Sequence, residues 1–305
     1  MTKAEAIALA SRYLKSLSGH VFDVLTIAKP VSSAGAANLA KVVSKLSPIL
    51  GNLIEFNVVE FLNDVEEFKP HGRWVRQDPG FPDAIFQGNI EPSPGFEIKA
   101  WFPLATEITA RFRDSQTYFE HDNIYVAILG WLPQNVIYGK PSIIDVCVIS
   151  AKSVAVARDT HYHNPPDYLV LEPEDTSQRT RNLRQTNTNG YKWQGTSEQF
   201  QQAIRIVKKW GKVRRQYNPG REYQERLREL IARFPYRLDT NFAKMDRIIH
   251  PDIEAFKTRV LGREIHGRTI SEWSRILFRS EETELRRELT EQLEIVDRDV
   301  EDILE

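Results

Sequence analysis

Cysteine is almost absent from this chain, because Cys147 is the only one among 305 residues. A single cysteine excludes disulfides within the chain, and its place in an apolar run predicts a buried thiol. The sequence also has no apolar run that approaches the ~18 residues of a membrane-spanning helix. Its first residues lack the pattern of a secretory signal. We therefore expect a cytoplasmic protein that makes no contact with a membrane.

The chain also lacks an overall charge bias, because its formal net charge is −1. The charges are nevertheless distributed unevenly along the sequence. Basic side chains far outnumber acidic ones between residues 176 and 237, whereas residues 281–305 are predominantly acidic. This asymmetry predicts a region that binds a polyanion, followed by an acidic segment that faces away from it.

The most informative stretch is 81–102, with the sequence FPDAIFQGNIEPSPGFEIKAWF. Two apolar runs, 84–86 and 96–102, are separated by a turn rich in Pro, Ser and Gly. This pattern predicts a pair of strands joined by a tight connection. Because side chains alternate along a strand, we expect Glu97 and Lys99 to share one face and Ile98 to occupy the other.

Two acids and a lysine on an otherwise apolar strand pair are costly unless each charge has a partner. A divalent cation offsets the cost of the acids, and Mg²⁺ is commonly held by one or two carboxylates together with phosphate oxygens. A lysine beside such an ion can position or activate the attacking water. The combination of Asp83, Glu97 and Lys99 therefore favours metal-assisted hydrolysis of a phosphodiester bond.

At Pro82-Asp83 and Glu97-x-Lys99 the sequence resembles the PD-(D/E)xK nuclease superfamily, and type II restriction endonucleases in particular. The resemblance implies that Asp83 and Glu97 bind Mg²⁺, with the carbonyl of Ile98 nearby. It assigns Lys99 to positioning or deprotonating the attacking water. It also implies sequence-specific cleavage of double-stranded DNA to 5′-phosphate and 3′-hydroxyl ends. A palindromic recognition site would require a two-fold homodimer.

A fourth acid, Glu55, is expected on a helix over residues 51–63. One helical turn places it beside Gly51, Val58 and Val59, on a mostly apolar face. A partly buried carboxylate needs a reason, and in the resembled nucleases a glutamate on the preceding helix often joins the active site. We therefore include Glu55 among the candidate catalytic residues, with a purely structural carboxylate as the alternative.

The order of elements predicts an α/β fold. Helices over 2–17 and from about 32 to 46 precede the helix that carries Glu55, and 69–80 is expected to be a loop before the hairpin. The continuous apolar runs 123–131 and 142–150 are typical of central strands covered on both faces. We expect a mixed central sheet flanked by helices, in the order of the restriction-endonuclease-like core.

Residues 1–240 would form this core, with a DNA-recognition insert around 176–220. Helices are expected after Thr196 or Ser197 and over 221–234. Residues 241–305 would be wholly helical, packed on the core or placed at a dimer interface.

The DNA-contacting residues are expected in three segments. The polar stretch 177–195 interleaves aromatic residues with Arg, Asn and Gln, which pair with guanine and adenine in the major groove. Arginines after the catalytic strand and a basic cluster near 210 would contact the phosphate backbone. The candidates are Arg111, Arg113, Arg179, Arg181, Arg184, Gln185, Asn187, Asn189, Lys192, Lys208, Lys209 and Lys212.

Two alternatives remain open from the sequence. A DNA repair or junction nuclease would use the same site on a different substrate. A non-catalytic DNA-binding protein would instead carry Glu97 and Lys99 as a surface ion pair. A further PD-like pattern, Pro251-Asp252 with Glu254 and Lys257, lies in a helical stretch without a strand pair, and we therefore discount it.

Overall fold

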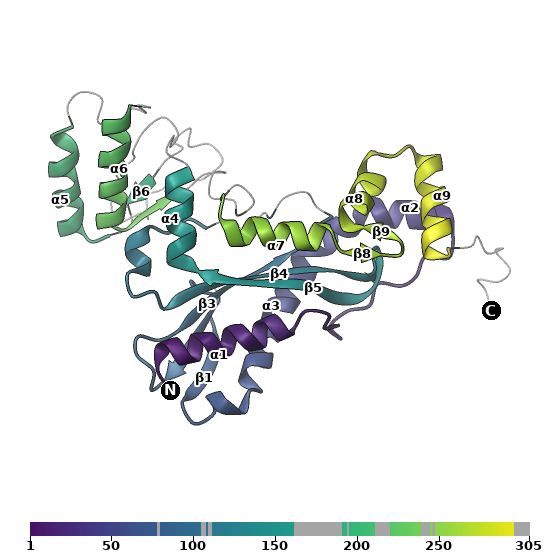
Figure 1. Cartoon of the computed structure of the whole chain (residues 1–305), viewed down its shortest axis with the longest axis horizontal. Coiled ribbons are helices and arrows are strands. Elements are labelled where there is room, and N and C mark those ends of the chain that lie inside the picture. Colours follow the sequence, from purple (N-terminus) through teal and green to yellow (C-terminus); the bar gives the residue numbers. More distant parts are fainter. Residues whose placement is uncertain are drawn as a thin grey trace. The chain divides into compact units, whose positions relative to one another are not determined.

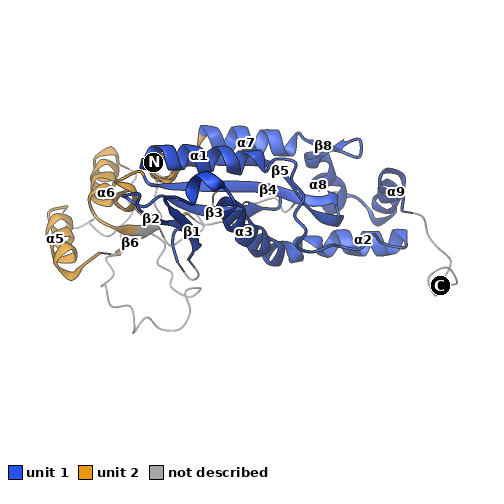
Figure 2. Ribbon diagram, turned by 90° about the horizontal axis from the view of Figure 1, so that it is seen from below, with its two compact units in different colours: residues 1–108, 123–149, 251–305 blue, residues 109–122, 150–250 orange. Residues whose placement is uncertain are grey.

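The computed structural model describes residues 1–77, 80–104, 108, 112–161, 191–193, 195–210, 220–238, 245 and 248–295. These residues form two compact units. Unit 1 comprises residues 1–108, 123–149 and 251–305, and unit 2 comprises residues 109–122 and 150–250 (Figure 2). The segment after residue 250 thus belongs with the sheet, which differs from the boundary at 240 drawn from the sequence.

Unit 1 is an α/β structure built on a five-stranded mixed sheet in the order β1-β2-β3-β4-β5 (Figure 1). The strands are β1 (Gly72–Arg76), β2 (Ala84–Gly88), β3 (Gly95–Trp101), β4 (Ile124–Asn135) and β5 (Tyr138–Ser150). Neighbours β1–β2 and β2–β3 are antiparallel, whereas β3 and β4 are parallel. The predicted strand pair and the two long apolar strands are therefore present.

The segment expected as a loop over 69–80 instead contains strand β1. The Trp74 ring of β1 packs edge-on against Phe86 of β2 and at a tilt against Phe96 of β3, with ring centroids 5.2 and 5.3 Å apart. All three rings are buried. Hydrophobic contact across three strands thus overrides the Gly, Pro and charged residues that suggested a loop.

Helices cover both sides of this sheet. The N-terminal helices are α1 (Lys3–Ser16), α2 (Ser33–Val42) and α3 (Ser47–Asn63). Helix α3 packs along β1 and β3, and a Cβ added to Gly51 would lie 3.5 Å from the Ala100 side chain. On the other side, Phe256 of α7 (Pro251–Leu261) packs against Trp101, with the two rings tilted. Figure 2 shows α3 and α7 on opposite sides of the strands.

Helix starts follow the local sequence signals. Thr2 begins α1 with a capping box, in which its hydroxyl accepts from the Glu5 amide while the Glu5 carboxylate accepts from the Thr2 amide. Ser32 caps α2 in the same position. These caps supply partners for backbone N–H groups that the first helical turn leaves unpaired.

The C-terminal part of unit 1 is not wholly helical, so that expectation was wrong. A two-stranded hairpin, β8 (Glu264–Ile265) and β9 (Arg268–Thr269), separates α7 from α8 (Ile270–Arg279) and α9 (Glu282–Leu293). His266 and Gly267 both adopt positive φ at the turn. The Gly262–Gly267 stretch that looked like a simple helix break therefore folds as a tight hairpin. Helix α9 packs against α2, where Lys41 pairs with Glu282 at 3.2 Å.

Unit 2 has its own core. Its elements include η3 (Gln116–Phe119), α4 (Ala151–His161), β6 (Tyr191–Trp193), α5 (Ser197–Lys208), α6 (Arg221–Arg233) and β7 (Tyr236–Leu238). Trp193 is fully buried among residues of α5, α6 and β7, including Val207, Leu227 and Tyr236. The two helices lie side by side over the β6–β7 pair (Figure 1). The predicted helices at 197 and 221 are thus confirmed.

Cys147 is a buried free thiol, as the sequence predicts. Burial raises the pKa of this thiol to about 11, so it is protonated at neutral pH. In the described part of the chain, the helical stretch Ser33–Asn63 is the one segment long and apolar enough to cross a membrane by length and composition alone. Core helices of water-soluble proteins pass the same test, and Leu50, Ile54 and Leu62 of this stretch are fully buried.

Candidate active site at the open edge of strand β3

Strand β2 pairs with β3 over only a short length. The aligned residues are Ala84 with Phe96 and Ile85 with Gly95. Strand β3 continues to Trp101 beside β4, and its N–H groups at alternate positions point toward the edge that β2 has left. The amides of Ile98 and Ala100 lie at this edge and need acceptors other than β2.

Two carboxylates supply those acceptors. Asp83, the residue before β2, accepts a hydrogen bond from the Ile98 amide at 2.7 Å. Glu55 of α3 accepts one from the Ala100 amide. The early end of the β2–β3 pairing therefore brings an acid from each of two other segments to the strand that carries Glu97 and Lys99.

Lys99 lies between the acids and is directed toward them. Its Nζ atom is 2.5 Å from Oε1 of Glu97 and 3.4 Å from Oδ2 of Asp83. The exposed fraction of the side chain is 18% for Lys99, 8% for Glu97 and 25% for Asp83. The Glu97–Lys99 pair is thus largely buried, which disagrees with the alternative of a surface ion pair. Ile98 is fully buried, as strand alternation predicts.

Burial dominates the electrostatics of the two innermost acids. It raises the pKa of Glu97 to about 7, with the Lys99 charge opposing the shift and the Asp83 charge adding to it. Burial likewise raises the pKa of Glu55 to about 7, opposed by the charge of Lys99 and the amide of Ala100. Both acids therefore hold protons more tightly than ordinary glutamates.

For Lys99, burial and the neighbouring acids act on the pKa in opposite directions. Removal from water by itself lowers the pKa of Lys99, because the charged form loses hydration. The charges of Glu97, Asp83 and Glu55 outweigh this effect and raise the pKa above the ordinary lysine value. Lys99 is consequently a cation in this cluster at neutral pH.

One oxygen of the cluster lacks a hydrogen-bond donor. Oε2 of Glu97 is buried and has no hydrogen-bond partner. A buried acceptor without a partner is costly, and a cation is one group that satisfies it. Within the described residues, no three His, Cys, Asp or Glu side chains form a group placed to hold a metal. A cation here would therefore rely on two carboxylates with other oxygen ligands, which is the common pattern for Mg²⁺.

The structure brings together the four candidate catalytic residues, Glu55, Asp83, Glu97 and Lys99. Only some of the residues expected to contact DNA lie in the part of the chain that the structure describes. Lys208 ends α5 and Lys209 caps it, and both side chains are exposed. Arg113 lies before η3 in unit 2. Lys192 is on β6, with its side chain outside the described set. The remaining candidates lie outside the described residues, namely Arg111, Arg179, Arg181, Arg184, Gln185, Asn187, Asn189 and Lys212.

The second PD-like pattern lies on helix α7, as the sequence indicates. Lys257 pairs there with Glu254, one helical turn away, at 2.7 Å. The exposed fraction of the Glu254 side chain is 47%. This pair is a helical i,i+3 ion pair, and such pairs stabilise a helix only weakly.

Sequence reasoning missed two features of the cluster. The Ala100 amide is a partner of Glu55, and the charge of Arg76 in β1 also acts to lower the pKa of Glu55. Neither has a motif in the sequence, because both depend on how β1, β2 and α3 meet β3. The open edge of β3 was hidden for the same reason.

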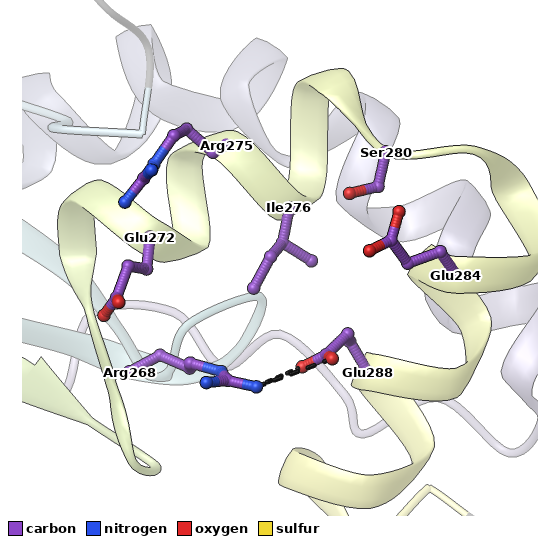
Figure 3. A pocket seen from close by; sticks show the side chains of 7 residues that line it. All are labelled: Arg268, Glu272, Arg275, Ile276, Ser280, Glu284 and Glu288. Atoms are coloured by element: carbon purple, nitrogen blue, oxygen red, sulfur yellow. Dashed lines mark hydrogen bonds and ion pairs between the residues drawn. The ribbon is translucent and has the colours of Figure 1, made fainter.

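Two cavities of unit 1 are lined by other residues. The larger, of 420 Å³, lies between β9, α8 and α9 (Figure 3). The Arg268–Glu288 ion pair, at 3.1 Å, crosses one side of it, and Ile276 points into its centre. The second, of 350 Å³, is lined by residues such as Gly19, Gln134 and Arg263. Neither cavity includes a residue of the Asp83–Glu97–Lys99 cluster.

Comparison of the chain with protein families, with curated proteins and with solved structures finds no match. The features of the chain that point to a function are therefore the geometry at the edge of β3 and the charges of unit 2.

Proposed function

We propose that this protein is a Mg²⁺-dependent endonuclease that cleaves double-stranded DNA at specific sequences, in the manner of a type II restriction enzyme. The observation that carries the proposal is the convergence of Asp83, Glu97 and Lys99 at the open edge of β3. The order of α3, the β2–β3 pair, β4 and β5 agrees with the order expected for the resembled superfamily.

The acids fit the role of cation ligands. Asp83 and Glu97 are near enough for their carboxyl groups to interact directly, and the charge of Asp83 contributes to the raised pKa of Glu97. Asp83, Glu97 and the carbonyl of Ile98 would hold Mg²⁺, whose charge would stabilise the transition state and lower the pKa of the attacking water. The unsatisfied Oε2 of Glu97 supports a cation at this place.

The lysine fits a positioning role better than a basic one. A raised pKa keeps the Lys99 ammonium protonated, so its Nζ donates hydrogen bonds and offsets negative charge. An ammonium beside Asp83 and Glu97 can orient the attacking water and stabilise charge that develops on the phosphate. Proton removal from the water then falls to another acceptor, such as a substrate oxygen or bulk water.

Glu55 fits a supporting role. Its carboxylate accepts a hydrogen bond from the Ala100 amide, and the charges of Asp83 and Lys99 affect its pKa. A glutamate with a pKa of about 7 can exist in either protonation state at neutral pH, so it can take up or release a proton next to the site.

The decisive experiment is digestion of a fully sequenced plasmid with the purified protein and Mg²⁺, followed by sequencing of the fragment ends. We expect discrete fragments that share one short sequence, with 5′-phosphate and 3′-hydroxyl termini. Nicks confined to mismatches or junctions would favour a repair nuclease. Absence of any cleavage under Mg²⁺ or Mn²⁺ would refute the endonuclease.

Two variants separate chemistry from binding. Asp83→Ala and Lys99→Ala should each lower the single-turnover cleavage rate by at least about a hundredfold, because each removes a cation ligand or a charge stabiliser. DNA affinity in the absence of metal should stay within a few fold of the wild type. Cleavage at the wild-type rate in both variants would show that the reaction occurs elsewhere.

Cleavage of both strands at a palindromic sequence would require a homodimer, which sedimentation with the cognate duplex would detect.

A further inference from the structure

Helix α5 carries a continuous polar face that no other described segment covers. The exposed side chains recur at helical spacing, so that they share one face of the helix. After Ser197 at the start of the helix, they are Glu198, Gln201, Gln202, Arg205, Lys208 and Lys209. No ion pair or side-chain hydrogen bond joins Gln201, Gln202, Arg205, Lys208 or Lys209 to the rest of the described chain.

The opposite face of α5 is fixed in the core of unit 2. Ala203 and Val207 are buried against Trp193 and the residues of α6, and Phe200 packs on the Trp193 ring at 5.7 Å. The helix start is fixed by a capping box in which the Thr196 hydroxyl accepts from the Gln199 amide. The polar face is thus presented by a helix whose rotation is set by packing.

On the neighbouring helix α6, two arginines form ion pairs with acids of the same helix. On α6, Arg221 pairs with Glu225 at 2.7 Å and Arg226 pairs with Glu222, each one turn apart. These i,i+4 pairs neutralise Arg221 and Arg226 within the helix itself. Helix α5 has only Glu198 to oppose Arg205, Lys208 and Lys209, and this acid lies at the other end of the helix. Among the described residues, no acid neutralises the cations of α5, and their exposed side chains can contact an external polyanion.

We infer that α5 is a recognition helix that enters the major groove of double-stranded DNA, with Gln201, Gln202 and Arg205 contacting base edges and Lys208 and Lys209 contacting phosphates. This inference rests on the proposed function, because it names the element that selects the sequence to be cut. It places base recognition on a folded helix as well as on the polar stretch 177–195.

The chemistry of this face matches that occupant. Glutamine pairs with adenine and arginine with guanine through two hydrogen bonds each, and the major groove is wide enough for a helix. The twelve residues of α5 span about 18 Å, which exceeds the groove width of about 12 Å. The central residues therefore lie in the groove while the lysines at the helix end reach the backbone.

The test is selection of bound sequences by the full-length protein in EDTA, from a pool of 30-base-pair duplexes with a randomised centre. The wild type, Gln202→Ala and Arg205→Ala are compared with Arg226→Ala on α6 as the matched control. We expect Gln202→Ala and Arg205→Ala to lose the base preference at one or two positions of the selected sequence. Affinity for that sequence should fall by about 5- to 150-fold for Arg205→Ala. Arg226→Ala should retain the wild-type preference.

A second set of variants isolates the phosphate contacts. Lys208→Gln and Lys209→Gln should weaken binding to every duplex similarly, and each should reduce the slope of log affinity against log salt by about 1. Circular dichroism and melting temperature of all variants should match the wild type, because the substituted side chains are exposed. A duplex RNA should compete poorly, since its major groove is too narrow to admit side chains.

Several results would overturn the inference. These are unchanged selected sequences in both Gln202→Ala and Arg205→Ala, equal affinity losses on all duplexes, or equal competition by RNA or polyglutamate. The plasmid digestion distinguishes this failure from failure of the nuclease. Variants that still cut at the wild-type sites would refute the role of α5 alone, whereas selective binding without any cleavage would refute the nuclease alone.

Discussion

The charged side chains at the edge of β3 are largely buried and paired, whereas those on α5 are exposed to solvent. In unit 1, Lys99 is surrounded by acids and largely removed from water. In unit 2, Arg205, Lys208 and Lys209 are exposed, and no ion pair joins them to the part of the chain that the structure describes. Buried charges are fixed in position and strongly coupled, which suits chemistry at one bond. Exposed charges act through solvent and are screened by salt, which suits association with an extended polyanion.

The strongest way to sharpen this comparison is to contrast two glutamate–lysine pairs of the same chain. Glu97→Gln removes a buried acid whose Oε2 lacks a donor, whereas Glu254→Gln removes an exposed acid paired with Lys257 on α7. We expect Glu97→Gln to lower the single-turnover cleavage rate about a thousandfold, and Glu254→Gln to change it less than twofold. Similar rates for the two variants in a quenched-flow assay would remove the distinction between the pairs.

The second test concerns the scaffold that holds Glu55 at the β3 edge. Ile54 is fully buried on α3, beside Glu55, whereas Asn52 is exposed on the same helix. Ile54→Ala should lower the free energy of unfolding by about 2–5 kcal/mol, because it leaves a cavity in the core. Asn52→Ala should change it by less than about 0.5 kcal/mol. Urea denaturation followed by tryptophan fluorescence measures both, and comparable losses would mean that α3 is loosely packed.

A third test uses the pH dependence of stability in a chelator. Glu55 and Glu97 have folded pKa values of about 7, raised above the ordinary 4.5. As pH rises from about 4.5, the unfolded chain releases these protons before the folded one does, so the two acids favour unfolding progressively until about pH 7. We expect the melting temperature to decline over this window and the decline to be smaller in Glu97→Gln and Glu55→Gln.

Added Mg²⁺ should oppose that trend, because a cation binds the ionised acids of the folded state. The stabilisation by 10 mM Mg²⁺ should therefore be greater at pH 8 than at pH 6. A melting temperature that is flat between pH 5 and 8 in the wild type would contradict the raised pKa values. An equal Mg²⁺ effect in Glu97→Gln would place the ion elsewhere.

The smallest expected effect compares two capping boxes. Thr196 starts α5 in unit 2 and Thr269 starts α8 in unit 1, with the same reciprocal hydrogen bonds. Each Thr→Ala change should cost about 1 kcal/mol of stability. Only Thr196→Ala should also weaken DNA binding, by two- to threefold in fluorescence anisotropy, since it loosens the helix that we assign to the groove. If both variants weakened DNA binding equally, the assignment of α5 to the DNA groove would be contradicted.

The local sequence predicted most of the helices and strands, but it did not predict the tertiary contacts between them. The hairpin around Asp83, Glu97 and Lys99 followed from Gly and Pro punctuation, and the helix caps from Thr and Ser at the right spacing. Strand β1 was missed because it depends on the packing of Trp74 against Phe86 and Phe96 of two other strands. The β8–β9 hairpin was missed although its pairing is local, because positive φ at His266 and Gly267 turns the chain where the pattern suggested only a helix break. The boundary between the units was also hidden, since each unit is made of separated segments.

The sequence by itself determined which residues are candidates for the site: the two acids and the lysine of the 81–102 stretch, and the cation-rich segment after residue 176. Only the tertiary structure decided that β2 leaves β3 after two aligned pairs, which opens the Ile98 and Ala100 amides to Asp83 and Glu55. The physical reason is that backbone groups at a sheet edge must find acceptors. Which acceptor they find depends on packing between elements that no local pattern specifies.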